Sequence, residues 1–189
     1  MFSFFKKPLA RMDAKELRKS EILASGQQKR LTRQIEGLAA QKQSIFEHGA
    51  KTKSPELRRT LAQQFELLTT HEMIAGRTLN MATKEAMIIG QLLAARTHGG
   101  RESLINRRDI AGLQLVMDKD AAAAAAYHAM LDEALAGMAV AEGEAGLSEA
   151  GNAVLRCWGE MDAGTTELGD AMAEADRATR AKIAASQSE

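Results

Sequence analysis

The residues that most resemble a catalytic or metal-binding motif are His71 and Glu72, which begin the zinc-protease pattern HExxH. That pattern needs a second histidine one helical turn later, but Ala75 occupies the position. The carboxylate-bridged metal pattern Glu-x-x-His fails as well, because Leu68 stands three residues before His71. The chain also lacks a phosphate loop and a G-x-S-x-G motif. The sequence therefore predicts no catalytic residues, no metal, no cofactor and no enzyme activity.

The remaining reactive side chains have structural interpretations. Cys157 is the only cysteine, so it cannot form a disulfide within the chain. We expect it to be a small core residue of a protein in a reducing compartment. His48 and His98 precede glycines at predicted helix ends, where a cation interacts favourably with the helix dipole.

The first ten residues, MFSFFKKPLA, have the composition of a membrane contact. The phenylalanines precede the lysines, which is the reverse of the order in a secretory signal, and their apolar run is too short for one. The longest uncharged runs, 121–131 and 86–95, fall short of the roughly 20 residues that a spanning helix requires. We therefore expect residues 1–8 to touch a membrane surface, with a hydrophobic cap on the end of a helical hairpin as the alternative.

The net charge of zero conceals a division along the chain. Residues 1–110 hold 20 Lys and Arg against 11 Asp and Glu, a net charge of +9, and residues 111–189 carry −9. We expect the front half to seek anionic surfaces and the back half to fold over it. Alternatively, the charge division reflects only two solvent-exposed helical faces of opposite charge. Nucleic acid is not predicted as a partner, because no aromatic residues are interleaved with the cations.

The composition of the chain and the positions of its glycines and prolines predict an all-α fold. Aromatic residues make up 4% of the chain and there are two prolines, so good helix formers dominate. We predict long helices at about 9–48 and 55–97, the second beginning with Ser54 as cap and Pro55 in the first turn. The short connection between them predicts an antiparallel hairpin, so 9–98 forms a basic hairpin domain.

Both long helices carry apolar residues at seven-residue intervals, which demand a packing partner. The stripe of the first helix contains Leu17, Ala24, Leu31, Leu38 and Ile45. The second helix is apolar over a wider arc, and we expect part of it to contact other copies through Ile74, Met81 and Ile88.

The acidic region 99–189 is less regular. We predict a third helix at about 106–141 and a short helix near 149–161 capped by Ser148. The short helix has an apolar face, and its glycine-rich flanks suggest a docking helix that covers its own hairpin or that of a neighbour. Its predicted self-assembly residues are Val154, Leu155, Trp158 and Met161. A plain core anchor is the other interpretation of Trp158.

This layout resembles the ESCRT-III superfamily of membrane-remodelling proteins, which includes phage-shock protein A and the plastid vesicle-inducing protein. Residues 28–36, QKRLTRQIE, are similar to the first-helix sequence of phage-shock protein A. Residues 56–62, ELRRTLA, resemble the start of that family's second helix. Residues 147–162 resemble the acidic helix that folds back on the hairpin in eukaryotic members.

The resemblance implies a cytoplasmic protein, peripheral on the inner face of a membrane, that forms homopolymers such as filaments, rings or helical tubes. The predicted membrane-binding residues are Phe2, Phe4, Phe5, Lys6, Lys7, Arg11, Lys15, Arg18 and Lys19. Arg177, Arg180 and Ala181 stand where the eukaryotic tail motif has leucines around an arginine, which puts an AAA ATPase partner in doubt. A soluble coiled-coil scaffold or partner-binding protein without a membrane role is the alternative function.

Overall fold

The computed structural model describes residues 12–97 and 147–186. These residues form four helices and no strand, which confirms the predicted all-α class: α1 (Ala14–Lys51), α2 (Pro55–Thr97), α4 (Glu149–Asp162) and α5 (Leu168–Ser186). The third helix expected at 106–141 and the expected contacts from Phe2 to Arg11 lie outside the described residues. None of the four described helices combines the length and apolarity needed to cross a bilayer.

Helix α1 begins with a reciprocal cap. The backbone N–H of Glu16 donates to Asp13 Oδ1 at 2.7 Å, and the N–H of Asp13 donates to Glu16 Oε2 at 3.0 Å. This arrangement satisfies two backbone donors that helix geometry leaves without partners, and it places an acid in the first turn. The predicted start near residue 9 was therefore too early, because Met12 and Asp13 are not helical.

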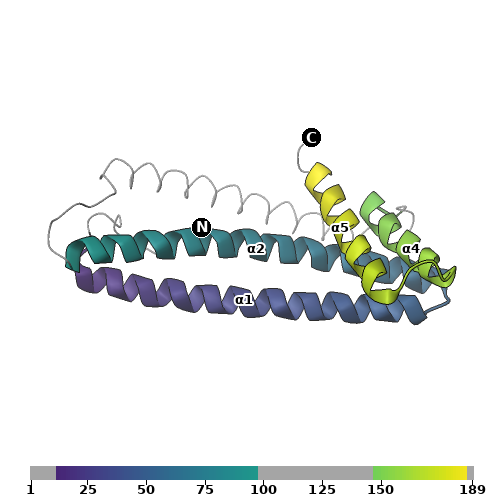
Figure 1. Ribbon diagram of the computed structural model, residues 1–189, viewed down its shortest axis with the longest axis horizontal. Helices are drawn as coiled ribbons and strands as arrows, with labels where there is room; N and C mark the ends of the chain where they lie inside the picture. Colours follow the sequence, from purple (N-terminus) through teal and green to yellow (C-terminus); the bar gives the residue numbers. More distant parts are fainter. Residues whose placement is uncertain (1–11, 98–146, 187–189) are drawn as a thin grey trace, which may run out of the picture. The chain divides into compact units, whose positions relative to one another are not determined.

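The end of α1 also differs from the prediction. The helix was expected to stop at about residue 48, yet it continues through Gly49 to Lys51. Only residues 52–54 then connect it to α2, which runs beside it in the opposite direction (Figure 1). The predicted start of α2 is confirmed, since Ser54 Oγ accepts the N–H of Leu57 at 3.4 Å and Pro55 is the first helical residue.

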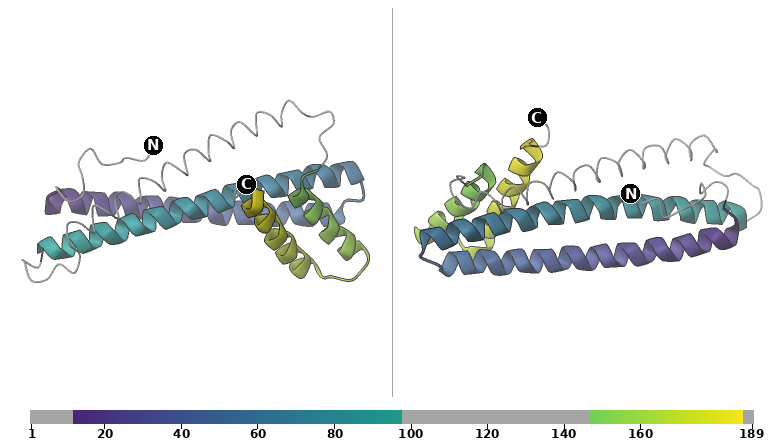
Figure 2. Two further views of the ribbon diagram at one scale, coloured as in Figure 1. Left: turned by 90° about the horizontal axis from the view of Figure 1, so that it is seen from above. Right: turned by 180° about the vertical axis from the view of Figure 1, so that it is seen from behind.

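Helices α4 and α5 form a second, shorter hairpin (Figure 2). Ser148 caps α4 as predicted, accepting the N–H of Gly151 at 2.9 Å, and the helix matches the range expected near 149–161. The turn that follows uses Gly164 with a φ of 72°, a left-handed conformation that glycine adopts without steric cost.

The contacts of the chain divide into two compact units, and α1 and α2 contribute to both. Among the described residues, unit 1 comprises 12–32 and 76–97, and unit 2 comprises 33–75 and 147–186. Within the described residues, the core of unit 1 is aliphatic: Met12, Leu17, Ala24, Ile88 and Ile89. The core of unit 2 is built around three aromatic rings from α1, α2 and α4.

Candidate functional site

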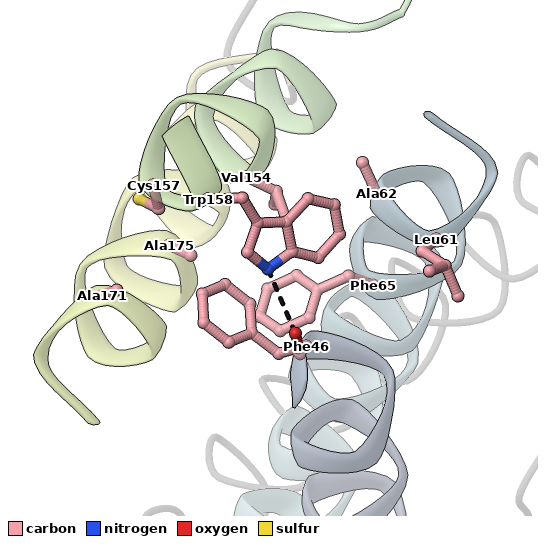
Figure 3. Close-up of a cluster of buried hydrophobic side chains, with 9 residues drawn as sticks. All are labelled: Phe46, Leu61, Ala62, Phe65, Val154, Cys157, Trp158, Ala171 and Ala175. Atoms are coloured by element: carbon pink, nitrogen blue, oxygen red, sulfur yellow. Dashed lines mark hydrogen bonds between the residues drawn. The ribbon is translucent and has the colours of Figure 1, made fainter. Parts of the chain in front are cut away.

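The aromatic residues that the structure describes all meet in one cluster in unit 2 (Figure 3). The ring centroids of Phe46 and Phe65 are 5.7 Å apart, and those of Phe46 and Trp158 are 5.5 Å apart. Both pairs are tilted, which suits the quadrupoles of aromatic rings. All three side chains are fully buried. We call the surface of α1 and α2 that receives the indole the Trp158 seat; it contains Phe46, Gly49 and Phe65.

A directional hydrogen bond, as well as burial, fixes Trp158 in the seat. Its indole Nε1–H donates to the backbone carbonyl of Phe46 at 3.1 Å, the dashed line in Figure 3. A β-carbon added at Gly49 would lie only 2.5 Å from Trp158 Cε2 and closer still to other ring atoms. Gly49 is therefore a contact that lets the indole approach the helix backbone, and the sequence interpretation of it as a helix stop was wrong.

Smaller side chains complete the cluster around the indole. Val154 and Cys157 of α4 and Ala171 and Ala175 of α5 are all buried there (Figure 3). Two other residues predicted for self-assembly, Leu155 and Met161, are half-buried against the same cluster. The prediction that Cys157 is a small core residue is confirmed, and burial raises the pKa of its thiol.

A cluster of four charged residues attaches α5 to both long helices. We call Lys42, Glu72, Asp176 and Arg180 the charge cluster. Lys42 Nζ donates to Glu72 Oε2 at 2.6 Å and to Asp176 Oδ1, and its ammonium lies 5.4 Å from the centroid of the Phe65 ring. Arg180 pairs with the same two carboxylates at 2.8 and 2.7 Å. The cluster is electrically balanced, so the buried ammonium of Lys42 has carboxylate partners.

Asp176 stays charged although it is partly buried, because it pairs with two cations. Desolvation acts to raise the pKa of Asp176, but hydrogen bonds and attraction from Lys42 and Arg180 hold that pKa below its ordinary value. Desolvation likewise opposes the charge of Arg180, while Asp176 and Glu72 raise its pKa. Both residues are therefore held in their charged forms by each other and by the long helices.

Further polar contacts join the long helix α2 to residues at the two ends of α4. Arg58 of α2 donates to Asp162 at 2.5 and 3.1 Å, which raises the pKa of the guanidinium and lowers that of the carboxyl. The Ser148 hydroxyl donates to Glu66 Oε2 at 2.5 Å. A pocket of about 300 Å³ lies beside the charge cluster, and its charged lining residues Lys42, Glu72 and Asp176 already pair with each other or with Arg180.

The residues of α2 expected to contact other copies lie mostly inside the subunit. Ile74 and Ile88 are 5% and 4% exposed, and Met81 is half-buried. Met87, which was not among them, is 61% exposed.

One face of α1 in unit 1 is basic and exposed. Lys15, Arg18, Lys19, Lys29 and Arg30 are all exposed, and Ile22 among them is 73% exposed. At 3.6 residues per turn these six residues share the side of α1 opposite to buried Leu17 and Ala24, with Glu16 and Glu21 outside it. We call these six residues the basic face; three of them were predicted to bind a membrane.

Sequence reasoning missed the charge cluster and the extent of the basic face. Asp176 and Arg180 are spaced as a helical i, i+4 ion pair, which was a usable local signal. Lys42 and Glu72 gave no such signal, because their partners are distant in sequence. The missed members of the basic face, Ile22, Lys29 and Arg30, could have been found by extending the helical period from Lys15.

Among the described residues, no group of three or more His, Cys, Asp or Glu side chains is placed to hold a metal ion. No protein-family model, curated protein or solved structure matches this chain.

Proposed function

We propose that this protein binds anionic membranes peripherally and self-assembles on them, remodelling the membrane as a polymer of its own copies. The observation that carries the membrane part is the basic face of α1. Five exposed cations surround the exposed Ile22 on one side of a helix whose other side is buried. Such a face suits the boundary between lipid headgroups and acyl chains.

The energetics favour binding by many copies together. Each cation near an anionic surface contributes about 1 kcal/mol, and this attraction is screened by salt over about 8 Å at physiological ionic strength. One copy is therefore held weakly, whereas a polymer multiplies the contact. Phe2, Phe4, Phe5, Lys6, Lys7 and Arg11 are proposed to add an apolar anchor and further cations to the same contact.

Flotation with anionic liposomes tests the membrane contact. Reversing Lys15, Lys19 and Lys29 to Glu removes three attractive charges and adds three repulsive ones, so bound protein should fall more than tenfold. The control reverses Lys51, Lys53 and Arg59, which are exposed in unit 2 and change the net charge equally. Equal loss in both variants would indicate a response to net charge alone and would contradict a specific face.

Two further variants separate the apolar parts of the contact. Ile22→Ser should weaken flotation, whereas Leu57→Ser, at a residue 42% exposed in unit 2, should not. Deleting residues 1–7 should weaken flotation further while the helical content of the protein is retained. Full binding by the deletion variant would exclude the N-terminal anchor.

For self-assembly we propose that α4 also docks on the hairpin of a neighbouring copy. The Trp158 seat is built from α1 and α2 alone, so the same surface suits α4 of either copy. Trp158→Ala should then reduce sedimentable polymer. An unchanged pellet from folded variant protein would leave Trp158 as an internal packing residue.

The charge cluster favours a second candidate, a soluble scaffold that binds a partner protein and has no membrane role. Its contacts hold α5 on the hairpin without any lipid. Protein that stays at the bottom of the flotation gradient at low salt would select this function instead.

A further inference from the structure

Three cations cluster in the first turns of α1. Lys15 stands three residues before Arg18 and four before Lys19, and at these spacings the β-carbons of a helix lie about 5–6 Å apart. All three side chains are exposed. Ile22, which is 73% exposed, follows Arg18 by one turn on the same side of the helix. We call Lys15, Arg18 and Lys19 the cation triad.

The cation triad is electrostatically unfavourable in the free protein, because like charges at these spacings repel and weaken a helix. Arg156 and Glu160 of α4 show the opposite arrangement, in which residues four positions apart carry opposite charges and pair. None of the three cations pairs with an acid in the part of the chain that the structure describes. An anion bound between them would relieve their repulsion, so the triad suits an anionic ligand.

The other cations of the basic face are too distant to share one phosphate with the triad. Lys29 follows Lys19 by ten residues, which corresponds to about 15 Å along a helix. Arg30 is its neighbour, so these two residues form a separate pair. Within the basic face, only the triad therefore offers three cations to a single phosphate group.

The number of cations in the triad favours one class of phosphate. A phosphodiester headgroup, as in phosphatidylglycerol, carries a single negative charge. A phosphomonoester carries about 1.5 to 2 negative charges near neutral pH and presents three acceptor oxygens. Three oxygens can accept from three cationic side chains, and the guanidinium of Arg18 can donate two parallel hydrogen bonds. A terminal phosphate therefore relieves more of the repulsion than a phosphodiester does.

We propose that the cation triad binds the terminal phosphate of a phosphomonoester lipid such as phosphatidic acid, while Lys29 and Arg30 meet anionic headgroups of any kind. This assignment rests on the membrane function proposed above, and it names the lipid class that one part of the basic face prefers. Ile22 favours a lipid over free phosphate as the ligand, because it places an apolar side chain beside the triad, where it can contact the acyl chains.

Flotation with two kinds of vesicle tests this subsite. One kind contains phosphatidic acid and the other phosphatidylglycerol, both in phosphatidylcholine, and the compositions are adjusted to equal zeta potential so that the general attraction is the same. The unmodified protein should bind the phosphatidic acid vesicles about fivefold more tightly, because the extra phosphate charge at the triad contributes as much as one more cation near an anionic surface. Lys15→Gln/Lys19→Gln should weaken binding to both vesicles and remove the preference.

The matched control is Lys29→Gln/Arg30→Gln, which also removes two exposed cations from α1. It should weaken binding to both vesicles by the same factor and keep the preference for phosphatidic acid. Equal binding of the unmodified protein to the two vesicles would overturn the subsite. A preference that survives Lys15→Gln/Lys19→Gln would overturn it too, because it would then arise from the conical shape of phosphatidic acid. Flotation with neither vesicle would instead refute the membrane function, and the subsite with it.

Discussion

Units 1 and 2 hold the same two long helices together by different means. In unit 1 the described core consists of aliphatic side chains, and the hydrogen bond from Gln28 Nε2 to Thr83 at 3.3 Å joins the helices at its exposed edge. In unit 2 three aromatic rings, an indole hydrogen bond and the charge cluster around buried Lys42 fix the positions of α4 and α5.

The difference lies in directionality. Aliphatic burial is roughly proportional to area and tolerates small shifts between helices. The contacts of unit 2 are directional, and a displaced α5 would leave Lys42 without a partner on that helix. Unit 2 is therefore the part of the molecule whose geometry is specified narrowly, and a single substitution there should have sharper consequences than one in unit 1.

The largest expected effect is at Trp158. Trp158→Ala should cost about 3–5 kcal/mol, because a large aromatic side chain leaves a cavity. Amide hydrogen exchange should accelerate in α4 and α5 but stay unchanged around Leu17 and Ile88. Trp158→Phe keeps a ring and loses the hydrogen bond to Phe46, so it should cost about 1 kcal/mol more than the loss of area alone. Faster exchange throughout both units after Trp158→Ala would show that the two cores are one cooperative structure.

Lys42→Met should have the next largest effect. It removes two charge-assisted hydrogen bonds and leaves Arg180 alone to compensate Glu72 and Asp176, at a cost of about 1.5–3 kcal/mol in urea unfolding. Lys182→Met is the control, because Lys182 pairs with the exposed Glu149 and should change stability little. Equal effects of the two variants would mean that burial does not distinguish the charge cluster.

Gly49→Ala tests the close approach of the indole. The new methyl group must displace Trp158, so we expect a loss of about 1–3 kcal/mol in thermal unfolding. Gly159→Ala in α4 has open space and should instead add up to about 1 kcal/mol through helix propensity. If Gly49→Ala were stabilising too, Trp158 would have room to shift and the seat would be less narrowly specified than we infer.

The smallest effect concerns pH, and it should have opposite signs in the two units. Burial raises the pKa of Glu85 in unit 1, so stability that depends on its protonated form is present below about pH 4.3 and is lost as the pH rises. The pKa of Asp176 is lowered, so its stability is present above about pH 3.9 and is lost on acidification. Glu85→Gln should therefore stabilise the protein at pH 7 but not at pH 3, as followed by circular dichroism during urea unfolding. A gain at both pH values would contradict titration of Glu85 as the cause.

Local signals in the sequence predicted where the helices lie better than they predicted which residues of different helices contact each other. Ser54 with Pro55, and Ser148, identified two helix starts correctly, because a cap is made by residues that adjoin the helix. The apolar face of the helix near 149–161 was also identified correctly, because Val154 and Trp158 are buried. The seven-residue stripe of α1 correctly predicted that Leu17 and Ala24 are buried. Near the end of α1 the stripe contains Ile45, whereas the neighbouring Phe46 is the fully buried residue.

Tertiary contacts explain what the sequence could not predict. Gly49 looks like a helix stop until the indole that covers it is known. Lys42 looks like a solvent-exposed residue until Glu72 and Asp176 are brought to it from residues 30 and 134 positions away. The extent of the basic face was within reach of periodicity, whereas the membrane that it is proposed to bind requires experiment.

The burial of Trp158 gives the protein an intrinsic optical reporter. It is the only tryptophan in the chain, and its indole is fully enclosed with its N–H bonded to a carbonyl. Tryptophan emission depends on the polarity around the ring, so the emission of the unmodified protein reports on one event, the seating of α4. Fluorescence recorded during a lipid titration can therefore follow whether α4 stays in its seat, without any label or substitution.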